Sequence, residues 1–400
     1  MLRSSGELLL ELASDYPRPF VDPLGWQEGV VSLCRQLPQQ WRSAVAAVAV
    51  DGTSGTLLLT QPDGCPLGQA LPYYHSVPEQ AQAAADLVGS EGSDRPAASA
   101  SGSLARALAL IARHGAGRSS VLLRHQADWL SGWLLADWRW GEETNNLRLG
   151  WDQTEGRWLG AIAHQPWSGA LPDLRPAGAP LGHLAPAVAA ELGLPESCLV
   201  VAGCTDASAA VLAADPQPGD GVTVLGTTLV LKQFSPAPVQ GPGISCQHLA
   251  GRWLVGGASN AGAGVLRQFF DDALLAELSR QIDPRCSSGL ELRPLPRRGE
   301  RFPVDDPLLE PILEPRPVSD ALYLQALLEG LARVESQGWA ALEQRGAPAV
   351  TRVLSLGGGA RNPQWRAIRQ RILGVPVLNR PHCSAAQGMA RLALSALSQP

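Results

Sequence analysis

This 400-residue sequence contains almost no lysine. Of its 32 Lys and Arg residues only Lys232 is a lysine, and it lies inside an apolar run. A P-loop nucleotide enzyme needs a lysine in its glycine-rich turn, and a protein kinase needs one on a strand together with an H-R-D loop, which is also missing here. The two commonest designs for phosphoryl transfer are therefore excluded.

Excess positive charge and long hydrophobic runs are absent as well. The 32 basic residues face 37 acidic ones, and the charges are scattered along the chain, so no basic stripe indicates a nucleic-acid partner. No stretch approaches the roughly 18 uncharged apolar residues of a membrane span, so we expect no membrane partner. With 45% apolar and 17% charged residues, the chain can bury a large core and is expected to form two domains.

The seven cysteines are spread along the chain without a C-x-x-C pair. The odd count and the wide spacing argue against a disulfide framework and against a zinc site. We therefore predict reduced thiols and a cytoplasmic protein.

Patterns of helices and buried strands alternate in both halves of the sequence, which indicates an α/β protein. The main predicted helices lie at 23–37, 104–114, 126–135, 207–214, 265–278 and 318–344. The main predicted strands lie at 8–12, 44–50, 198–202, 222–225, 229–234, 253–256 and 350–356. A turn at 215–221 predicts a boundary between a domain of residues 1–218 and one of residues 219–400. Ligands of open α/β sheets bind at the carboxyl ends of the strands, which predicts a cleft between the domains.

The predicted strand at 8–12 is poorly paired. Only residues 1–3 precede the turn at 4–6 and could form its hairpin partner. We therefore expect the natural fold to begin before this chain does.

A carboxylate follows the predicted strand at 198–202. The residues Gly203 to Asp206 lead into an alanine-rich helix, so Asp206 lies on its first turn and faces the expected cleft. An aspartate at this position can be a simple helix cap. It can equally take the proton from a substrate hydroxyl that attacks a phosphoryl group. The small residues around it, Gly203 among them, leave room for a ligand and favour the second interpretation.

Two glycine turns could hold a nucleotide without lysine. The Gly-Thr-Thr turn at 226–228 presents backbone N–H groups and hydroxyls to phosphates, although many hairpins carry Gly-Thr as an ordinary turn. Three glycines at 357–359 join a strand to a helix, and a turn without Cβ atoms lets a flat ring lie against the backbone. Asn362 is predicted to cap that helix and to offer its amide to a base or ribose.

These motifs together resemble the FGGY carbohydrate kinases, a family in the superfamily of sugar kinases, actin and heat-shock chaperone ATPases. The run G-G-G-A-R-N-P-x-W at 357–365 is similar to the family's adenine-site signature. The segment at 202–210 is similar to its catalytic aspartate segment, 224–228 to its second phosphate motif, and 144–152 to its sugar-domain landmark. The resemblance covers nearly the whole chain and is closest to the shorter kinases of pentuloses, such as D-ribulose and xylulose.

The resemblance implies an α/β fold of two actin-like, ribonuclease H-like domains, with the sugar bound by residues 1–218 and the nucleotide by residues 219–400. It implies phosphorylation of a pentulose with ATP and Mg²⁺, with Asp206 as the catalytic base. Sugar and ATP are the expected partners, a homodimer is left open, and no residue is assigned to the metal. The implied nucleotide-binding residues are Gly226, Thr227, Thr228, Gly262, Gly357, Gly358, Gly359, Asn362 and Trp365.

One departure from the family pattern lies on the sugar side. A segment with His75 replaces the usual Asp-x-Arg, and His75 is either a specificity residue or an ordinary packing or surface residue. The loop at 51–55 imitates the family's first phosphate loop, but its spacing to Asp206 suits a sugar-facing segment or a structural turn. The candidate substrate residues are Asp51, Ser54, His75 and Asn145.

The family's first phosphate loop, Asp-x-Gly-Thr, is missing from the sequence. Loss of one group that stabilises the transition state costs on the order of a hundred- to a thousandfold in rate. An impaired member that binds sugar or nucleotide without turnover is therefore the alternative to a kinase. A filament protein or a chaperone ATPase is a third and more distant alternative, because neither would need the sugar-domain landmark.

Overall fold

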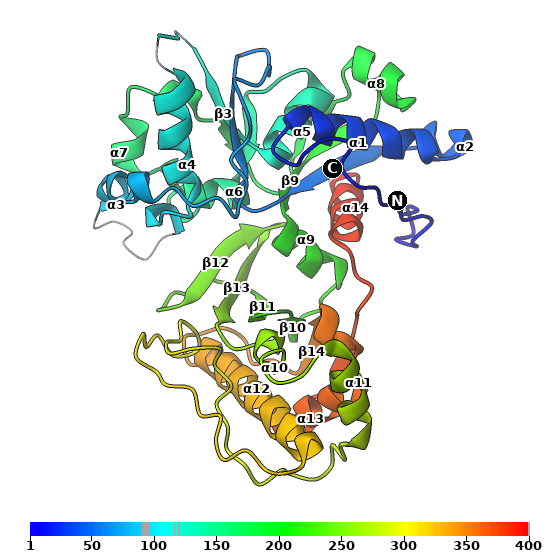
Figure 1. The fold of residues 1–400 in the computed structure, drawn as a ribbon. Helices are drawn as coiled ribbons and strands as arrows, with labels where there is room; N and C mark the ends of the chain where they lie inside the picture. The colour runs from blue at the N-terminus through cyan, green and yellow to red at the C-terminus, as the bar shows by residue number, and fades with distance from the viewer. Residues whose placement is uncertain (90–95, 116, 119, 399–400) are drawn as a thin grey trace. The chain divides into compact units, whose positions relative to one another are not determined.

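The computed structural model describes the chain except residues 90–95, 116, 119 and 399–400. The chain forms two compact units (Figure 1). The first unit consists of Met1–Ala213, His248–Gly251 and Ser384–Pro400, and the second of Ala214–Gln247 and Arg252–Cys383.

The last helix belongs to the first unit, whereas the predicted domain of residues 219–400 included it. Helix α14 (Ala385–Ala396) lies beside α9 (Asp206–Ala213) (Figure 1). The contact is close because Gly388 has no side chain: a Cβ there would lie 1.9 Å from the carbonyl oxygen of Ala209. The packing of α14 against α9, a helix that is distant in the sequence, thus places α14 in the first unit.

The sheet that carries the predicted base has three strands in the order β1-β9-β8. The strands predicted at 44–50 and 198–202 are β1 (Ala47–Gly52) and β9 (Leu199–Thr205), which pair in parallel, and β8 (Pro180–His183) pairs with β9 in the antiparallel sense. The other strands of the unit form two-stranded sheets: β2 (Leu57–Thr60) with β3 (Leu122–His125), β4 (Trp140–Glu142) with β7 (Asp173–Arg175), and β5 (Trp151–Asp152) with β6 (Arg157–Trp158).

The first helix of the first unit begins where the sequence offers both a cap and a proline. The carboxylate of Asp22 accepts a hydrogen bond from the backbone of Leu24 at the start of α1, and Pro23 is its first residue. Besides α9 and α14, the α-helices are α1 (Pro23–Gln36), α2 (Gln39–Arg42), α3 (Ala81–Val88), α4 (Ser103–Leu110), α5 (Gln126–Leu135), α6 (Glu143–Asn146), α7 (Gly160–Ala163) and α8 (Pro186–Leu192).

The predicted strand at 8–12 is wrong. The structure has a single isolated bridge between Leu2 and Leu8 in this region and no strand. One bridge cannot satisfy the backbone groups of five residues, so the segment stays irregular.

The second unit contains a six-stranded sheet in the order β12-β13-β11-β10-β14-β15. Strand β10 (Asp220–Leu225) is antiparallel to β11 (Leu229–Ser235) and parallel to β14 (Arg352–Leu356). The other strands are β12 (Ile244–Leu249), β13 (Arg252–Ser259) and β15 (Val377–Asn379).

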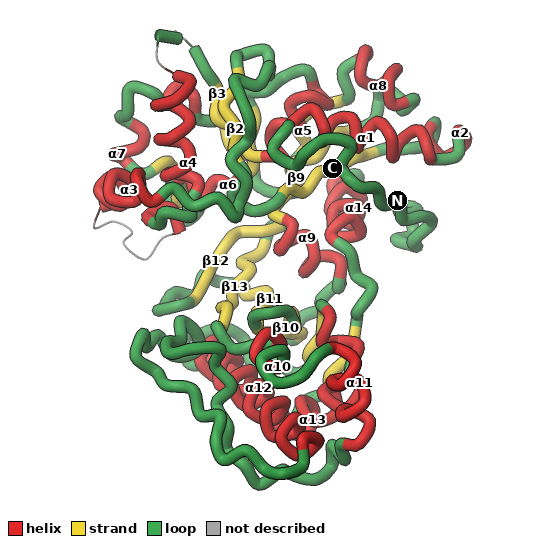
Figure 2. The backbone as a smooth tube through the Cα atoms, viewed as in Figure 1, coloured by secondary structure: helices red, strands yellow, loops and turns green. Residues whose placement is uncertain are grey.

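Helices α12 (Asp320–Glu343) and α13 (Pro363–Leu373) lie on one side of the second sheet (Figure 2). Their apolar faces join the strands in one core, in which Leu331, Ile368 and Val353 are fully buried. The predicted helix at 265–278 is interrupted and forms α10 (Ala263–Leu266) and α11 (Asp272–Gln281).

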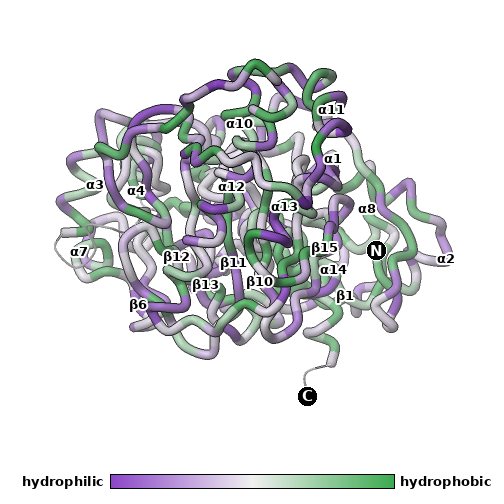
Figure 3. The backbone as a smooth tube through the Cα atoms, turned by 90° about the horizontal axis from the view of Figure 1, so that it is seen from below, coloured by the Kyte–Doolittle hydropathy of each residue, from purple (hydrophilic) through white to green (hydrophobic). Residues whose placement is uncertain are grey.

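Hydrophilic residues are distributed along the chain. Figure 3 shows these residues interspersed with hydrophobic ones along the backbone. In the part of the chain that the structure describes, no helix combines the length and the apolar character needed to cross a membrane.

Candidate functional site

The parallel strands β1 and β9 bring two carboxylates together at their carboxyl ends. Gly52 pairs with Thr205, so Asp51 and Asp206 lie at the same edge of the sheet. The register shifts where Ala202 and Gly203 of β9 lie opposite Val50 of β1, and a Cβ at Gly203 would lie 1.8 Å from the carbonyl oxygen of Val50. The glycine is therefore required by the neighbouring strand, which corrects the interpretation that it leaves room for a ligand.

Asp206 is the first residue of α9 and its carboxylate is held by two backbone groups. It accepts a 2.8 Å hydrogen bond from the N–H of Ala207 and another from the N–H of Ser54. Burial raises the pKa of Asp206 above its usual range, against the opposing effects of these hydrogen bonds and of the Arg148 charge. A carboxylate whose pKa is raised is a better proton acceptor than an ordinary surface aspartate.

Asp51 is the second carboxylate at this edge. Burial first, and then the negative charge of Asp206, raise the pKa of Asp51 to about 6. Both acids therefore hold protons more tightly than free aspartates, as expected for like charges in one partly buried site.

The loop at 51–55 connects the carboxylates to the landmark segment at 144–152. The Nε of Arg148 donates a 3.0 Å hydrogen bond to the hydroxyl of Ser54, and the N–H of Gly55 donates to Oδ1 of Asn145 at 3.4 Å. The structure thus brings together Asp51, Ser54, Asn145 and Asp206. Sequence reasoning missed Arg148, although it lies inside the landmark segment.

A buried glutamate fixes Asn145 and the residue before the base. The carboxyl oxygens of Glu142 accept hydrogen bonds from the N–H groups of Thr144 (2.6 Å) and Asn145 (2.5 Å) and from the Thr144 hydroxyl (2.6 Å). The same hydroxyl accepts a 3.2 Å hydrogen bond from the N–H of Thr205. Glu142 is 2% exposed. Burial raises its pKa, and the charge of Asp128 adds to this effect.

His75 reaches the loop at 51–55 through the main chain. Arg106 donates from Nε to the carbonyl of His75 and from Nη1 to the carbonyl of Gly55, both at 2.9 Å, and from Nη2 to the carbonyl of Tyr73 at 2.5 Å. The side chain of His75 itself is exposed. The three bonds of Arg106 fix the position of the His75 segment.

In the second unit, the turn at 226–228 is bonded to the turn before α10. The N–H of Ala263 donates to the carbonyl of Gly226 (2.9 Å), and the N–H of Gly264 donates to the carbonyl of Thr227 (3.1 Å). Gly262 must lack a side chain, because a Cβ there would lie 2.4 Å from the carbonyl oxygen of Thr227. The side chain of Thr227 is exposed and that of Thr228 half-buried. The structure therefore places Gly226, Thr227, Thr228 and Gly262 in one cluster.

The turn at 357–359 begins directly after β14, which pairs in parallel with β10 and brings this turn to the same sheet edge as the turn at 226–228. Gly357 has φ +81° and ψ −178°, a conformation that is essentially reserved for glycine. A Cβ at Gly359 would lie 2.4 Å from the ring of Trp365, whereas a Cβ at Gly358 would meet nothing within 4 Å. Two of the glycines serve the packing of the turn, and Gly358 borders open space.

Asn362 and Trp365 both contact the last glycine of this turn, Gly359. Oδ1 of Asn362 accepts a 3.0 Å hydrogen bond from the N–H of Trp365, which confirms the predicted cap of α13. Its Nδ2 donates to the hydroxyl of Ser279 at 2.9 Å, so both amide atoms are engaged within the protein. Trp365 is 2% exposed. Both residues can act on a nucleotide only through the turn.

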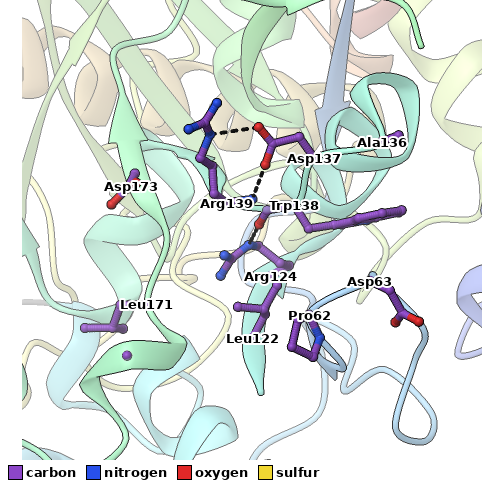
Figure 4. Close-up of a pocket in the computed structure, with 11 residues that line it drawn as sticks. Pro62, Asp63, Leu122, Arg124, Ala136, Asp137, Trp138, Arg139, Leu171 and Asp173 are labelled. Atoms are coloured by element: carbon purple, nitrogen blue, oxygen red, sulfur yellow. Dashed lines mark hydrogen bonds and ion pairs between the residues drawn. The ribbon is translucent and has the colours of Figure 1, made fainter. Parts of the chain in front are cut away.

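A separate pocket of about 500 Å³ lies in the first unit (Figure 4). Its charged lining includes Arg124 and an ion pair of 2.7 Å between Arg139 and Asp137. Arg124 donates to the carbonyls of Trp138, Leu123 and Ala170, which ties three segments together. None of the predicted site residues lines this pocket.

Comparison with known proteins agrees with the motifs. Residues 221–397 match the C-terminal domain of the FGGY family of carbohydrate kinases. A xylulose kinase from Brucella ovis has the same fold with a TM-score of 0.81 and 21% identity, over 100% of this chain and 88% of that one. For a xylulose kinase from Rhodospirillum rubrum the TM-score is 0.78 and the identity 22%, over 96% and 83% of the two chains. For Plasmodium falciparum glycerol kinase with ADP they are 0.77 and 14%, over 94% and 81%.

These matches confirm the resemblance predicted from the sequence. Residues 221–397 match the FGGY C-terminal domain, and the whole chain has the mixed α/β, two-domain actin-like fold of the solved kinases.

Proposed function

We propose that this chain, whose residues 221–397 match the C-terminal domain of the FGGY carbohydrate kinases, transfers the γ-phosphoryl group of ATP to a hydroxyl of a pentulose such as D-ribulose or D-xylulose. The observation that carries the proposal is the carboxylate of Asp206, which is held by the N–H groups of Ser54 and Ala207 and has a raised pKa. The similar folds of two xylulose kinases support a pentulose as the acceptor.

Asp206 would act as the general base. Its carboxylate accepts the proton of the sugar hydroxyl as that oxygen attacks the γ-phosphorus. The new O–P bond forms while the bond between the γ-phosphorus and the bridging oxygen of ADP breaks. Asp51, Ser54 and Asn145 are the neighbouring polar groups from which we expect contacts to the sugar.

The turns of the second unit would hold the nucleotide. The exposed Thr227 and the half-buried Thr228 offer hydroxyls to phosphate oxygens, and Gly262 lets the two turns approach each other. The open space beside Gly358 fits a flat ring that lies against the backbone.

We expect Mg²⁺ to arrive with ATP. Within the described residues, no group of three or more His, Cys, Asp or Glu side chains could hold a metal ion on its own. A divalent cation bound by the phosphates would neutralise part of their charge. We assign no residue of the chain to it.

The proposed setting is the cytoplasm. All seven cysteines are free, which supports a reducing compartment.

The direct test is release of ADP when the purified chain is mixed with ATP, Mg²⁺ and a panel of pentuloses, hexoses and polyols. We expect turnover with a pentulose that depends on Asp206 and is lost in Asp206→Asn. Binding of sugar and ATP without any ADP release above that variant would contradict the proposal and support the non-catalytic alternative.

A further inference from the structure

We propose that Arg148 is a sugar-binding residue whose terminal guanidinium nitrogens, Nη1 and Nη2, donate hydrogen bonds to hydroxyl oxygens of the acceptor. This inference rests on the proposed function and adds a specific contact to it.

Arg148 is placed at the site by its neighbours. It lies in the single 3₁₀ turn Leu147–Leu149, directly after α6, and its Nε donates to the Ser54 hydroxyl at 3.0 Å. The same Ser54 donates its backbone N–H to the carboxylate of Asp206. One residue therefore connects the guanidinium to the proposed base.

The terminal nitrogens of Arg148 have no partner in the part of the chain that the structure describes. Among the described residues, Arg148 makes one hydrogen bond, from Nε to Ser54. No carboxylate oxygen of these residues lies within 4.0 Å of its guanidinium nitrogens, so it forms no ion pair with them. The side chain is only half-buried, so a ligand can reach these nitrogens. Two terminal nitrogens of a partly desolvated cation, with four N–H groups between them, are left for a ligand.

The neighbouring Arg106 shows what a structural arginine looks like in this unit. It is fully buried, and its three guanidinium nitrogens donate to the carbonyls of His75, Gly55 and Tyr73. Arg124 is likewise committed to carbonyls on three segments. Arg148 differs from both, because its terminal nitrogens have no hydrogen-bond partner among the described residues.

The chemistry of the site favours a neutral polyol over an anion. Asp51 and Asp206 contribute two carboxylates, against which Arg148 is the cation that acts on Asp206. The other titratable groups that interact with Asp206 are the phenol of Tyr16 and the buried thiol of Cys204. Hydroxyl groups can accept from the guanidinium and donate to the carboxylates in the same site.

The test compares three variants with the wild-type chain. Arg148→Ala removes both charge and donors, Arg148→Lys keeps the charge and loses the planar fork, and Arg157→Ala is the control, an exposed arginine in the same unit. Sugar affinity is measured by calorimetry with D-ribulose and with D-xylulose in the absence of ATP. Steady-state kinetics as a function of pH are measured in parallel.

We expect Arg148→Ala to weaken sugar binding about ten- to a hundredfold, the loss typical of hydrogen bonds from a charged group. The acid limb of kcat/KM should also move to higher pH, because Asp206 loses a positive charge that favours its ionised form. Arg148→Lys should restore the acid limb but not the sugar affinity. The control should match the wild type.

Unchanged sugar affinity in folded Arg148→Ala would overturn the inference, even if kcat fell. Thermal melting shows whether Arg148→Ala is folded. If it is not, the sugar affinity of Arg148→Lys provides the test, and the inference predicts that this affinity is weaker than that of the wild type. Failure of the proposed function is recognised separately. If the wild-type chain binds sugar but does not turn over, calorimetry still compares its sugar affinity with that of the Arg148 variants.

Discussion

The guanidinium of Arg148 donates a 3.0 Å hydrogen bond to the hydroxyl of Ser54, whose backbone N–H donates to the carboxylate of Asp206. Three segments that are far apart in the sequence meet through this relationship: the loop at 51–55, the landmark at 144–152 and the start of α9. The proposed base is therefore oriented by residues of the sugar side, and not only by the first turn of its own helix.

The triple-glycine turn predicts two different outcomes for two similar substitutions. Gly357→Ala should destabilise the second unit by about 1–3 kcal/mol, because this backbone conformation is nearly reserved for glycine and a Cβ would lie 2.8 Å from the carbonyl oxygen of Leu225. Gly358→Ala should change stability by less than about 0.5 kcal/mol, yet raise the KM for ATP, because its methyl group enters the space assigned to the nucleotide. Urea unfolding and ATP kinetics on both variants check this pair. Equal destabilisation by the two would contradict it.

The buried carboxyl of Glu142 predicts a pH dependence of stability. Burial and the charge of Asp128 raise the pKa of Glu142 in the folded state above the usual 4.5. The unfolded chain then loses this proton at lower pH than the folded chain, so this residue makes the wild type less stable as the pH rises above about 4.5. Glu142→Gln cannot ionise and lacks that decline.

Urea unfolding at a series of pH values from 5 to 8 tests this sign. The stability of Glu142→Gln relative to the wild type should improve steadily as the pH rises. The exposed Glu155→Gln serves as the matched control and should keep a constant difference. A Glu142→Gln difference that is constant or that worsens with pH would show that the carboxyl is ionised in the fold.

The sheet edge beneath the nucleotide turns depends on a buried ion pair. Arg369 on α13 donates to both carboxylate oxygens of Glu335 on α12, at 2.6 and 2.7 Å, and to the hydroxyl of Ser355 on β14. The hydroxyl of Thr223 on β10 donates to the same carboxylate. The pair thus joins two helices to the two strands that lead into the turns.

Removal of one partner of this pair should be costly. Arg369→Met leaves the buried charge of Glu335 unpaired and should cost about 3–5 kcal/mol, whereas the double variant Arg369→Met/Glu335→Leu should recover much of the loss. Chemical unfolding of the single and double variants measures the difference. A double variant less stable than the single one would refute this account.

The sequence alone predicted the helices and strands whose ends or apolar runs are marked by residues within the element itself. Helix α5 has the bounds that were predicted, α1 begins at the predicted Pro23, and strands β1 and β9 form at the short apolar runs that predicted them. The cap of α13 followed from Asn362 and Pro363 in succession. In each case the determinant is local, so a short stretch of sequence contains it.

Of the features that the sequence did not reveal, one depends on a local helix cap and the others on partners far along the chain. The helix predicted at 265–278 is interrupted because Asp271 caps a new helix by accepting from the N–H of Leu274, and a periodic apolar pattern does not register that cap. Gly203 is required by Val50 on the neighbouring strand. Arg148 was missed because a single arginine in a mixed segment has no distinguishing pattern until Ser54 is placed beside it.

The identity of the product tests the central claim most directly. Wild-type chain and Asp206→Asn are incubated with ATP, Mg²⁺ and either D-ribulose or D-xylulose, and the sugar fraction is analysed by mass spectrometry and ³¹P NMR. The account predicts a sugar monophosphate from the wild type, formed in equal amount with ADP, and a yield lower by about a hundred- to ten-thousandfold from the variant that lacks the base. A sugar monophosphate formed equally by both proteins, or by neither while both bind ATP and sugar, would contradict it.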